Sequence, residues 1–157
     1  MSEGKRTRVR AIIIQDEKII SMYREKDGRV FYTFPGGGLE GNESEIDCVK
    51  REVFEEFGIV VEPIKKVYIY ENEISVEHFY ICEHISGDFG TGAGEEYDKN
   101  RNNGVYIPKM IDISNLPSLP LMPPEIAQAF YEDYIKNGKK LRKDVKLLYQ
   151  KSTRLKI

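Results

Sequence analysis

The chain has 157 residues, of which 40% are apolar and 32% charged, and these values fit one folded domain rather than two. No segment approaches the ~18 consecutive apolar residues that a membrane span needs, and the first ten residues are charged rather than apolar, so we expect a cytoplasmic protein without a signal peptide. Its two cysteines, Cys48 and Cys82, lack metal-ligand spacing, which argues against a disulfide framework or a zinc site.

Charge is distributed unevenly along the chain. Residues 136–157 contain nine Lys or Arg and one acid, so the formal net charge of −2 combines an acidic body with a basic end. We expect residues 1–138 to form the folded domain and residues 139–157 to form a basic tail, which adds a short helix or stays loose. The tail could contact RNA phosphates, with Tyr149 available to stack on a base, although basic termini also occur without such a role.

The N-terminal part of the chain has the residue pattern of β-strands. Residues 7–14 and 19–24 are rich in β-branched residues and flank a short polar turn, which predicts a hairpin. Residues 29–34 predict a third strand, which ends at Pro35 and the three glycines that follow it.

A helix is predicted next. Ser44 followed by Asp47 forms a capping box, and Gly58 is a favourable residue for the helix to end on. At 100° per residue, two stripes run side by side along this helix. The apolar stripe consists of Ile46, Val49, Val53 and Phe57, and the acidic stripe consists of Glu52, Glu55 and Glu56. The helix can therefore bury one face against a sheet and hold three carboxylates at the edge of that contact.

The remainder alternates between strands and a helix. Residues 59–73 and 74–85 predict two long strands, residues 86–104 a long loop, residues 105–113 a last strand and residues 124–138 a helix. Strands, helix, strands and helix in this order predict an α/β fold in which helices cover a mixed sheet.

Three carboxylates within five residues of the helix require an explanation. Charge runs are usually solvated helix faces. Here, however, the carboxylates repel one another and oppose the helix dipole near its C-terminal end, with Arg51 and Lys50 as the nearby positive charges. A divalent cation would offset this cost, and hard oxygen ligands without His or Cys suit Mg²⁺ or Mn²⁺. The helix is therefore interpreted as a metal platform.

The stretch "FPGGGLEG" at residues 34–41 precedes the helix. Glycines between a strand and a helix are often only a permissive turn, but the main chain of Gly37 and Gly38 can also approach a ligand closely. Beside a cation site, such a loop would suit a pyrophosphate.

These residues carry a resemblance to a known family. The pattern is Gly37, five residues, Glu43, seven residues, Arg51-Glu52-Val53, one residue, Glu55-Glu56, one residue and Gly58-Ile59. It resembles the signature box of the Nudix hydrolase family at every fixed position. The resemblance implies a Nudix-type α/β/α sandwich over residues 6–137, and hydrolysis of a phosphoanhydride in a nucleoside diphosphate linked to another group, with Mg²⁺ or Mn²⁺.

Residue roles follow from the same resemblance. It implies that Glu52, Glu55 and Glu56 are metal ligands and that Gly36 offers a carbonyl to the metal. Arg51 would brace the carboxylates through salt bridges and Glu43 would hold the junction between loop and helix, although both could be purely structural.

A further acidic residue completes the site or acts as a base in many relatives. Glu95 and Glu96, after "GTGAG", are the candidates by position, and a solvated loop tip is the alternative. A nucleobase would need an exposed aromatic side chain near the site, for which Phe34 and Tyr97 are candidates, although aromatic residues on strands are more often part of the core.

Three substrate-specific signatures of the family are absent, namely those of the ADP-ribose, dinucleoside polyphosphate and NADH groups. A nucleoside triphosphate or a modified nucleotide is therefore the expected substrate. An RNA 5′-end pyrophosphohydrolase that uses the basic tail and a non-hydrolytic nucleotide-binding regulatory module remain alternatives, and a homodimer is possible because family members are often dimers.

Overall fold

The computed structural model describes residues 4–89, 104–137 and 144–150. The strands are β1 (Arg6–Gln15), β2 (Lys18–Lys26), β3 (Arg29–Thr33), β4 (Gly36–Gly38), β5 (Val60–Glu71), β6 (Ser75–Ser86), β7 (Val105–Asp112), β8 (Leu121–Met122) and β9 (Lys146–Tyr149). The helices are α1 (Glu45–Phe57), α2 (Pro124–Lys136) and the 3-10 helix η2 (Ile113–Ser118). Within these described ranges, no helix is long and apolar enough to cross a membrane.

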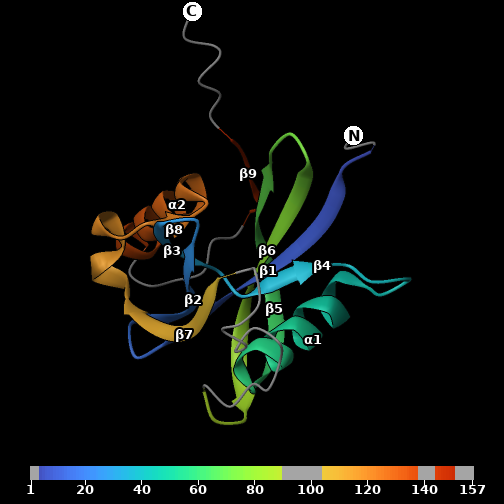
Figure 1. Cartoon of the computed structure of the whole chain (residues 1–157), viewed down its shortest axis with the longest axis horizontal. Coiled ribbons are helices and arrows are strands. Elements are labelled where there is room, and N and C mark those ends of the chain that lie inside the picture. Colours follow the sequence, from blue (N-terminus) through green and yellow to red (C-terminus); the bar gives the residue numbers. More distant parts are fainter. Residues whose placement is uncertain (1–3, 90–103, 138–143, 151–157) are drawn as a thin grey trace, which may run out of the picture.

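The strands form a mixed sheet in the order β8-β3-β2-β1-β6-β5-β9, with β4 paired to β1 and β7 paired to β2. Parallel pairs, such as β1 with β6, occur beside antiparallel ones, such as β5 with β6. The two α-helices lie on opposite sides of this sheet (Figure 1). The predicted α/β/α sandwich with a mixed sheet is confirmed.

Side chains of β1 alternate between two cores. Ala11 and Ile13 pack in the core under α1, whereas Ile12 packs in the core under α2. A period of two residues is what a strand with both faces covered requires. The sheet is therefore apolar on both faces over its central strands.

The predicted hairpin of β1 and β2 exists, but its pairing is short. Register is shared only at Ile14 with Ile19 and Gln15 with Lys18, next to the turn. Beyond that point the two strands separate, and the first half of β1 pairs with β4 instead, Arg8 opposite Gly38 and Val9 opposite Gly37. The separation opens the place at which the glycine-rich segment enters the sheet.

Local sequence signals define α1. The Ser44 side chain accepts a hydrogen bond from the Asp47 amide at 3.0 Å, and Gly58 ends the helix in the left-handed conformation. Val49, Val53 and the neighbouring Cys48 are fully buried. The predicted cap, end and apolar stripe are thus confirmed.

Two regions differ from expectation. Gly36–Gly38 form a short strand against β1 rather than a free loop. In the tail, the expected short helix or loose chain does not hold for residues 144–150, since Lys146–Tyr149 form β9, parallel to β5. The physical reason is that β5 would otherwise present an open edge, which β9 covers while Leu148 packs against the α2 core. Most of the predicted loop at 86–104 lies outside the described residues.

Substitution of two adjacent leucines, Leu147 and Leu148, tests whether β9 packs against the core under α2. Leu148 packs against the core, whereas Leu147 is 57% exposed. We expect Leu148→Ala to lower the free energy of unfolding by about 1–2 kcal/mol, and the unfolding temperature by several degrees, because half-buried methyl groups are lost. Leu147→Ala, the matched control, should change stability by less than about 0.5 kcal/mol. Equal effects of the two substitutions in urea unfolding would contradict the docking of β9.

Candidate active site

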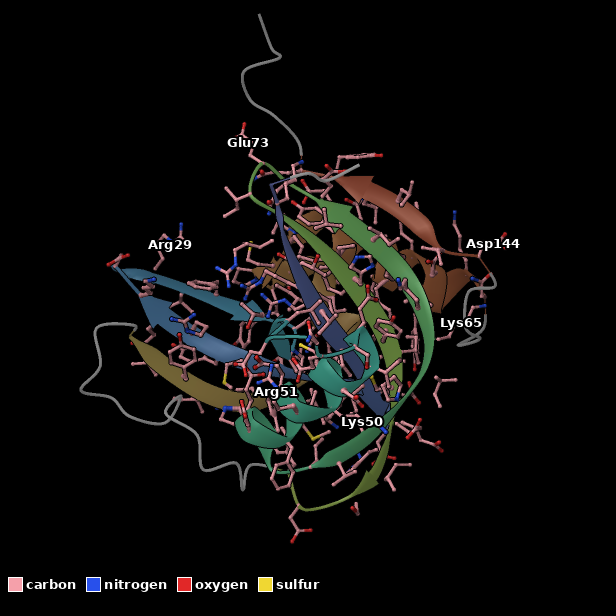
Figure 2. The ribbon with its side chains drawn as sticks, turned by 90° about the vertical axis from the view of Figure 1, so that its right-hand side faces the viewer. Arg29, Lys50, Arg51, Lys65, Glu73 and Asp144 are labelled. Atoms are coloured by element: carbon pink, nitrogen blue, oxygen red, sulfur yellow. The ribbon has the colours of Figure 1, made fainter. Side chains whose placement is uncertain are left out.

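Arg51, on α1 (Figure 2), contacts acidic side chains on this helix and on the turn before it. Its Nε donates to Glu43 Oε2 at 2.6 Å and its Nη2 to Glu43 Oε1 at 3.1 Å, a two-pronged contact. Its Nη1 lies 3.2 Å from Glu55 Oε1, 3.3 Å from Glu52 Oε2 and 3.6 Å from Glu40 Oε2. One guanidinium therefore contacts four carboxylates, and Glu43 also accepts from the Glu40 amide at 3.0 Å, which closes the turn before the helix.

The carboxylates differ in their environments. Hydrogen bonds from Arg51 lower the pKa of Glu43 to about 2, while burial raises the pKa of Glu52, with Arg51 opposing that shift and Glu55 adding to it. The pKa of Arg51 is raised in turn, chiefly by Glu43. Burial is thus the main influence on the pKa of Glu52, and an added positive charge nearby would favour its ionised form.

The glycine segment packs directly against these side chains. The Gly36 amide donates to Glu56 Oε1 at 3.1 Å. A Cβ atom at Gly37 would collide with the Glu52 carboxylate, and one at Gly36, where φ is 142°, would collide with the Val9 carbonyl. Glycine is required at position 36 because β4 lies so close to the main chain of β1, whereas a side chain at position 37 would displace the Glu52 carboxylate.

A second arginine fixes this segment from β1. Arg10 Nη1 donates to the carbonyls of Phe34 at 3.1 Å and Gly36 at 3.3 Å, and its Nε donates to Glu77 Oε1 at 3.2 Å. The Gly36 carbonyl, for which a metal contact was expected, therefore accepts from Arg10 here. Arg10 and Glu77 were not among the predicted site residues. The available signal was the recurrence of arginine at every second position, Arg6, Arg8 and Arg10, before the apolar residues 11–14.

The residues that the sequence predicts to contact substrate lie in different parts of the structure, and some lie outside the described residues. Phe34 is only 1% exposed and packs edge-to-face on Phe79, with ring centroids 5.3 Å apart. The proposed stacking of a base on Phe34 is therefore wrong for this structure, because the α2 core covers the ring. Glu95, Glu96 and Tyr97 lie outside the described residues. Gly37 and Gly38 lie in β4, beside the carboxylates of α1.

Whether the site suits a divalent cation can be judged from its donors. In the described ranges, no three His, Cys, Asp or Glu side chains are already arranged to hold a metal ion. Glu52 and Glu55 contact Arg51 instead, and Glu56 accepts from Gly36. The donors are nevertheless hard oxygens, and the Glu52 carboxylate lies directly against the main chain of Gly37, in the space that a side chain there would take. This chemistry fits Mg²⁺ or Mn²⁺.

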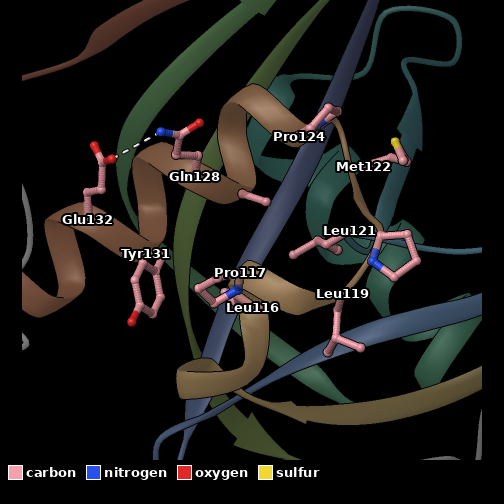
Figure 3. Close-up of a pocket in the computed structure, with 11 residues that line it drawn as sticks. Leu116, Pro117, Leu119, Leu121, Met122, Pro124, Gln128, Tyr131 and Glu132 are labelled. Atoms are coloured by element: carbon pink, nitrogen blue, oxygen red, sulfur yellow. Dashed lines mark hydrogen bonds between the residues drawn. The ribbon is translucent and has the colours of Figure 1, made fainter.

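A cavity of about 430 Å³ lies elsewhere, between η2, β8 and α2 (Figure 3). Its lining is mostly apolar, including Leu116, Leu119 and Tyr131, and Gln128 donates to Glu132 at 3.1 Å along its edge. No lysine or arginine lines it. A phosphorylated ligand needs cationic partners, so the candidate site is the junction of α1 and β4 rather than this cavity.

Comparison with known proteins bears on the family and the fold of the chain. A family model described as "NUDIX domain" matches residues 4–103, while no curated protein matches the chain in sequence. An ADP-ribose pyrophosphatase of Streptococcus suis is 20% identical, with a TM-score of 0.64, 90% of this chain covered and 98% of that one.

Two further solved structures share the fold. A NUDIX hydrolase of Nitrosomonas europaea is 16% identical, with a TM-score of 0.69 over 94% of this chain and 81% of that one. A MutT protein of Methanosarcina mazei is 18% identical, with a TM-score of 0.61 over 89% and 99%, respectively. Because the family model covers well over half of the residues, and the box residues meet at one junction of helix and sheet, the chain belongs to the Nudix hydrolase family.

Proposed function

We propose that the protein is a Mg²⁺-dependent pyrophosphohydrolase, with Mn²⁺ as a possible substitute, acting on a nucleoside triphosphate or a modified nucleotide. The observation that carries the proposal is the contact of β4 with α1, in which Glu56 accepts from the Gly36 amide and Glu52 lies against Gly37. Carboxylates beside a main chain that carries no side chains are what a phosphate chain with its cation requires. Structural neighbours that act as an ADP-ribose pyrophosphatase or carry the MutT name are in keeping with it.

Each part of the site has its own task in this proposal. Glu52, Glu55 and Glu56 would hold the cation. When bound, a divalent cation supplies charge neutralisation of the phosphate oxygens and activation of a water molecule. Gly37, which is buried against Glu52, and the half-buried Gly38 would meet the phosphates through their main chain. Arg51 keeps the carboxylates together before the cation arrives, since it is shared between Glu52 and Glu55.

A substrate panel tests this function. The full chain would be incubated with nucleoside triphosphates, oxidised nucleotides, nucleotide sugars, ADP-ribose, dinucleoside polyphosphates and triphosphorylated RNA, with Mg²⁺ or with EDTA, and the products would be separated by chromatography. Turnover of one class with Mg²⁺ and none with EDTA is the expected result. No turnover of any class, with nucleotide still binding, would instead favour a regulatory module.

Glu56→Gln tests the metal platform. Glutamine keeps the oxygen that accepts from Gly36 but loses the charge, so the fold should persist while kcat falls by about 100-fold or more, as expected when a charged group at a reacting centre is removed. Glu83→Gln, the same change at an exposed position of β6, is the control and should leave kcat unchanged. Equal kcat in Glu56→Gln and the parent would remove Glu56 from the proposed site.

The contact between Arg51 and Glu43 predicts a pH dependence of stability. The pKa of Glu43 lies at about 2, below its ordinary value of 4.5, so ionised Glu43 stabilises the fold above pH 4.5 and this contribution is lost as the pH falls towards 2. Glu43→Gln cannot ionise. The free energy of unfolding of the parent should therefore exceed that of the variant most at neutral pH, and the difference should shrink in acid. Urea unfolding across this range measures it, and a difference independent of pH would contradict the interpretation.

A further inference from the structure

Three arginines alternate along the first half of β1. Arg6, Arg8 and Arg10 occupy every second position, and the residues between them include Val9, which is fully buried in the core under α1. Because successive side chains of a strand point to opposite faces, the three arginines share the face turned away from α1.

Among the described residues, the side chain of Arg10 has hydrogen-bond partners, whereas the side chains of Arg6 and Arg8 have none. Arg10 is held by Glu77 and by the carbonyls of Phe34 and Gly36. Within the part of the chain that the structure describes, no side-chain hydrogen bond or ion pair involves Arg6 or Arg8. Arg8 is nonetheless only half-exposed, and burial together with repulsion from Arg10 lowers its pKa. A partly buried guanidinium without a partner is costly unless a ligand provides one.

The position of these two arginines relates them to the glycine segment. Arg8 lies opposite Gly38 in the pairing of β1 with β4, and Arg6 Nη2 lies 3.2 Å from where a Cβ atom of Gly38 would be. The charges of Glu77 and, to a smaller extent, Glu52 oppose this lowering of the Arg8 pKa, so Arg8 is attracted to carboxylates on both β6 and α1.

β4 is bordered by β1 on one side, and no second strand pairs with it among the described residues. A ligand that crosses this free edge would meet the carboxylates of α1 on one face, the main chain of Gly37 and Gly38 in the middle, and the guanidinium groups of Arg6 and Arg8 on the other face. Carboxylates that can bind a cation and guanidinium groups that can bind an anion thus lie on the two sides of one short strand.

We propose that Arg8, assisted by Arg6, binds a free terminal phosphate of the substrate. A terminal phosphate carries about −1.5 to −2 charges near pH 7, and the planar fork of arginine matches its oxygens. Two arginines without protein partners suit that charge better than the single charge of an internal phosphate. The protein therefore prefers nucleoside triphosphates to substrates in which both phosphates are esterified, such as nucleotide sugars. This inference rests on the proposed function and assigns the part of the substrate that β1 recognises.

Binding of inorganic triphosphate to the full chain tests the inference without turnover. Isothermal titration calorimetry would compare the parent, Arg8→Gln and Arg8→Lys, in EDTA and in Mg²⁺. Arg29→Gln, which removes the same charge at the exposed start of β3 (Figure 2), is the matched control. Arg8→Gln should weaken binding about tenfold or more, Arg8→Lys less because it retains the charge but not the fork, and Arg29→Gln less than about twofold. Equal affinity of Arg8→Gln and the parent, or no binding by the parent in either buffer, would overturn the inference.

Kinetics and stability separate a binding role from a structural one. KM for a nucleoside triphosphate should rise in Arg8→Gln while KM for a nucleotide sugar stays the same, and equal losses on both would overturn the inference. The unliganded variant should unfold at the parent's temperature or above it, because the Arg8 side chain donates no hydrogen bond to any described residue, and because burial and repulsion from Arg10 disfavour its charge. A parent that hydrolyses no substrate would refute the proposed function, whereas the calorimetric comparison would still decide the role of Arg8.

Discussion

The site depends on one guanidinium group shared among like charges. Glu43, Glu52 and Glu55 would repel one another on and beside a single helix, and Arg51 lies within 3.3 Å of each of them. Because Glu43 also closes the turn before α1, the same contact positions both the helix and the segment leading into it. Arg51 nevertheless carries a single positive charge, so it offsets the acidic cluster only in part. The uncompensated charge is what a divalent cation would balance, and this is the physical basis for assigning catalysis to α1.

The sheet contributes the second half of the site. β1 and β2 separate after a short hairpin, and β4 uses the opening to pair with β1. Glycine at positions 36 and 37 then allows main chain, carboxylates and arginines to approach one another more closely than any side chain would permit. Arg10 and Glu77 form a largely buried ion pair, and Arg10 also binds the main chain of β4, a strand of only three residues. The same pair therefore supports both the fold and the position of the candidate site.

Local features were predictable from sequence, and distant contacts were not. The cap at Ser44, the end at Gly58 and the buried stripe of α1 depend on neighbours within one or two turns, so residue spacing sufficed. The pairing of Arg10 with Glu77 joins residues 67 positions apart, and the burial of Phe34 depends on Phe79 and the α2 core. The strand β9 was missed for the same reason, because its partner is the edge of β5 rather than anything within the tail. Sequence thus identified the carboxylates, while the arginines of β1 required the fold.

The central claim is that the carboxylates of α1 hold a divalent cation. Electron paramagnetic resonance of Mn²⁺, without any substrate, measures this directly on the parent and on a Glu52→Gln, Glu56→Gln double variant. If α1 is the platform, the parent binds Mn²⁺ and the double variant, still folded, loses that binding. Equal Mn²⁺ binding by both proteins would contradict the account and place the cation elsewhere in the molecule.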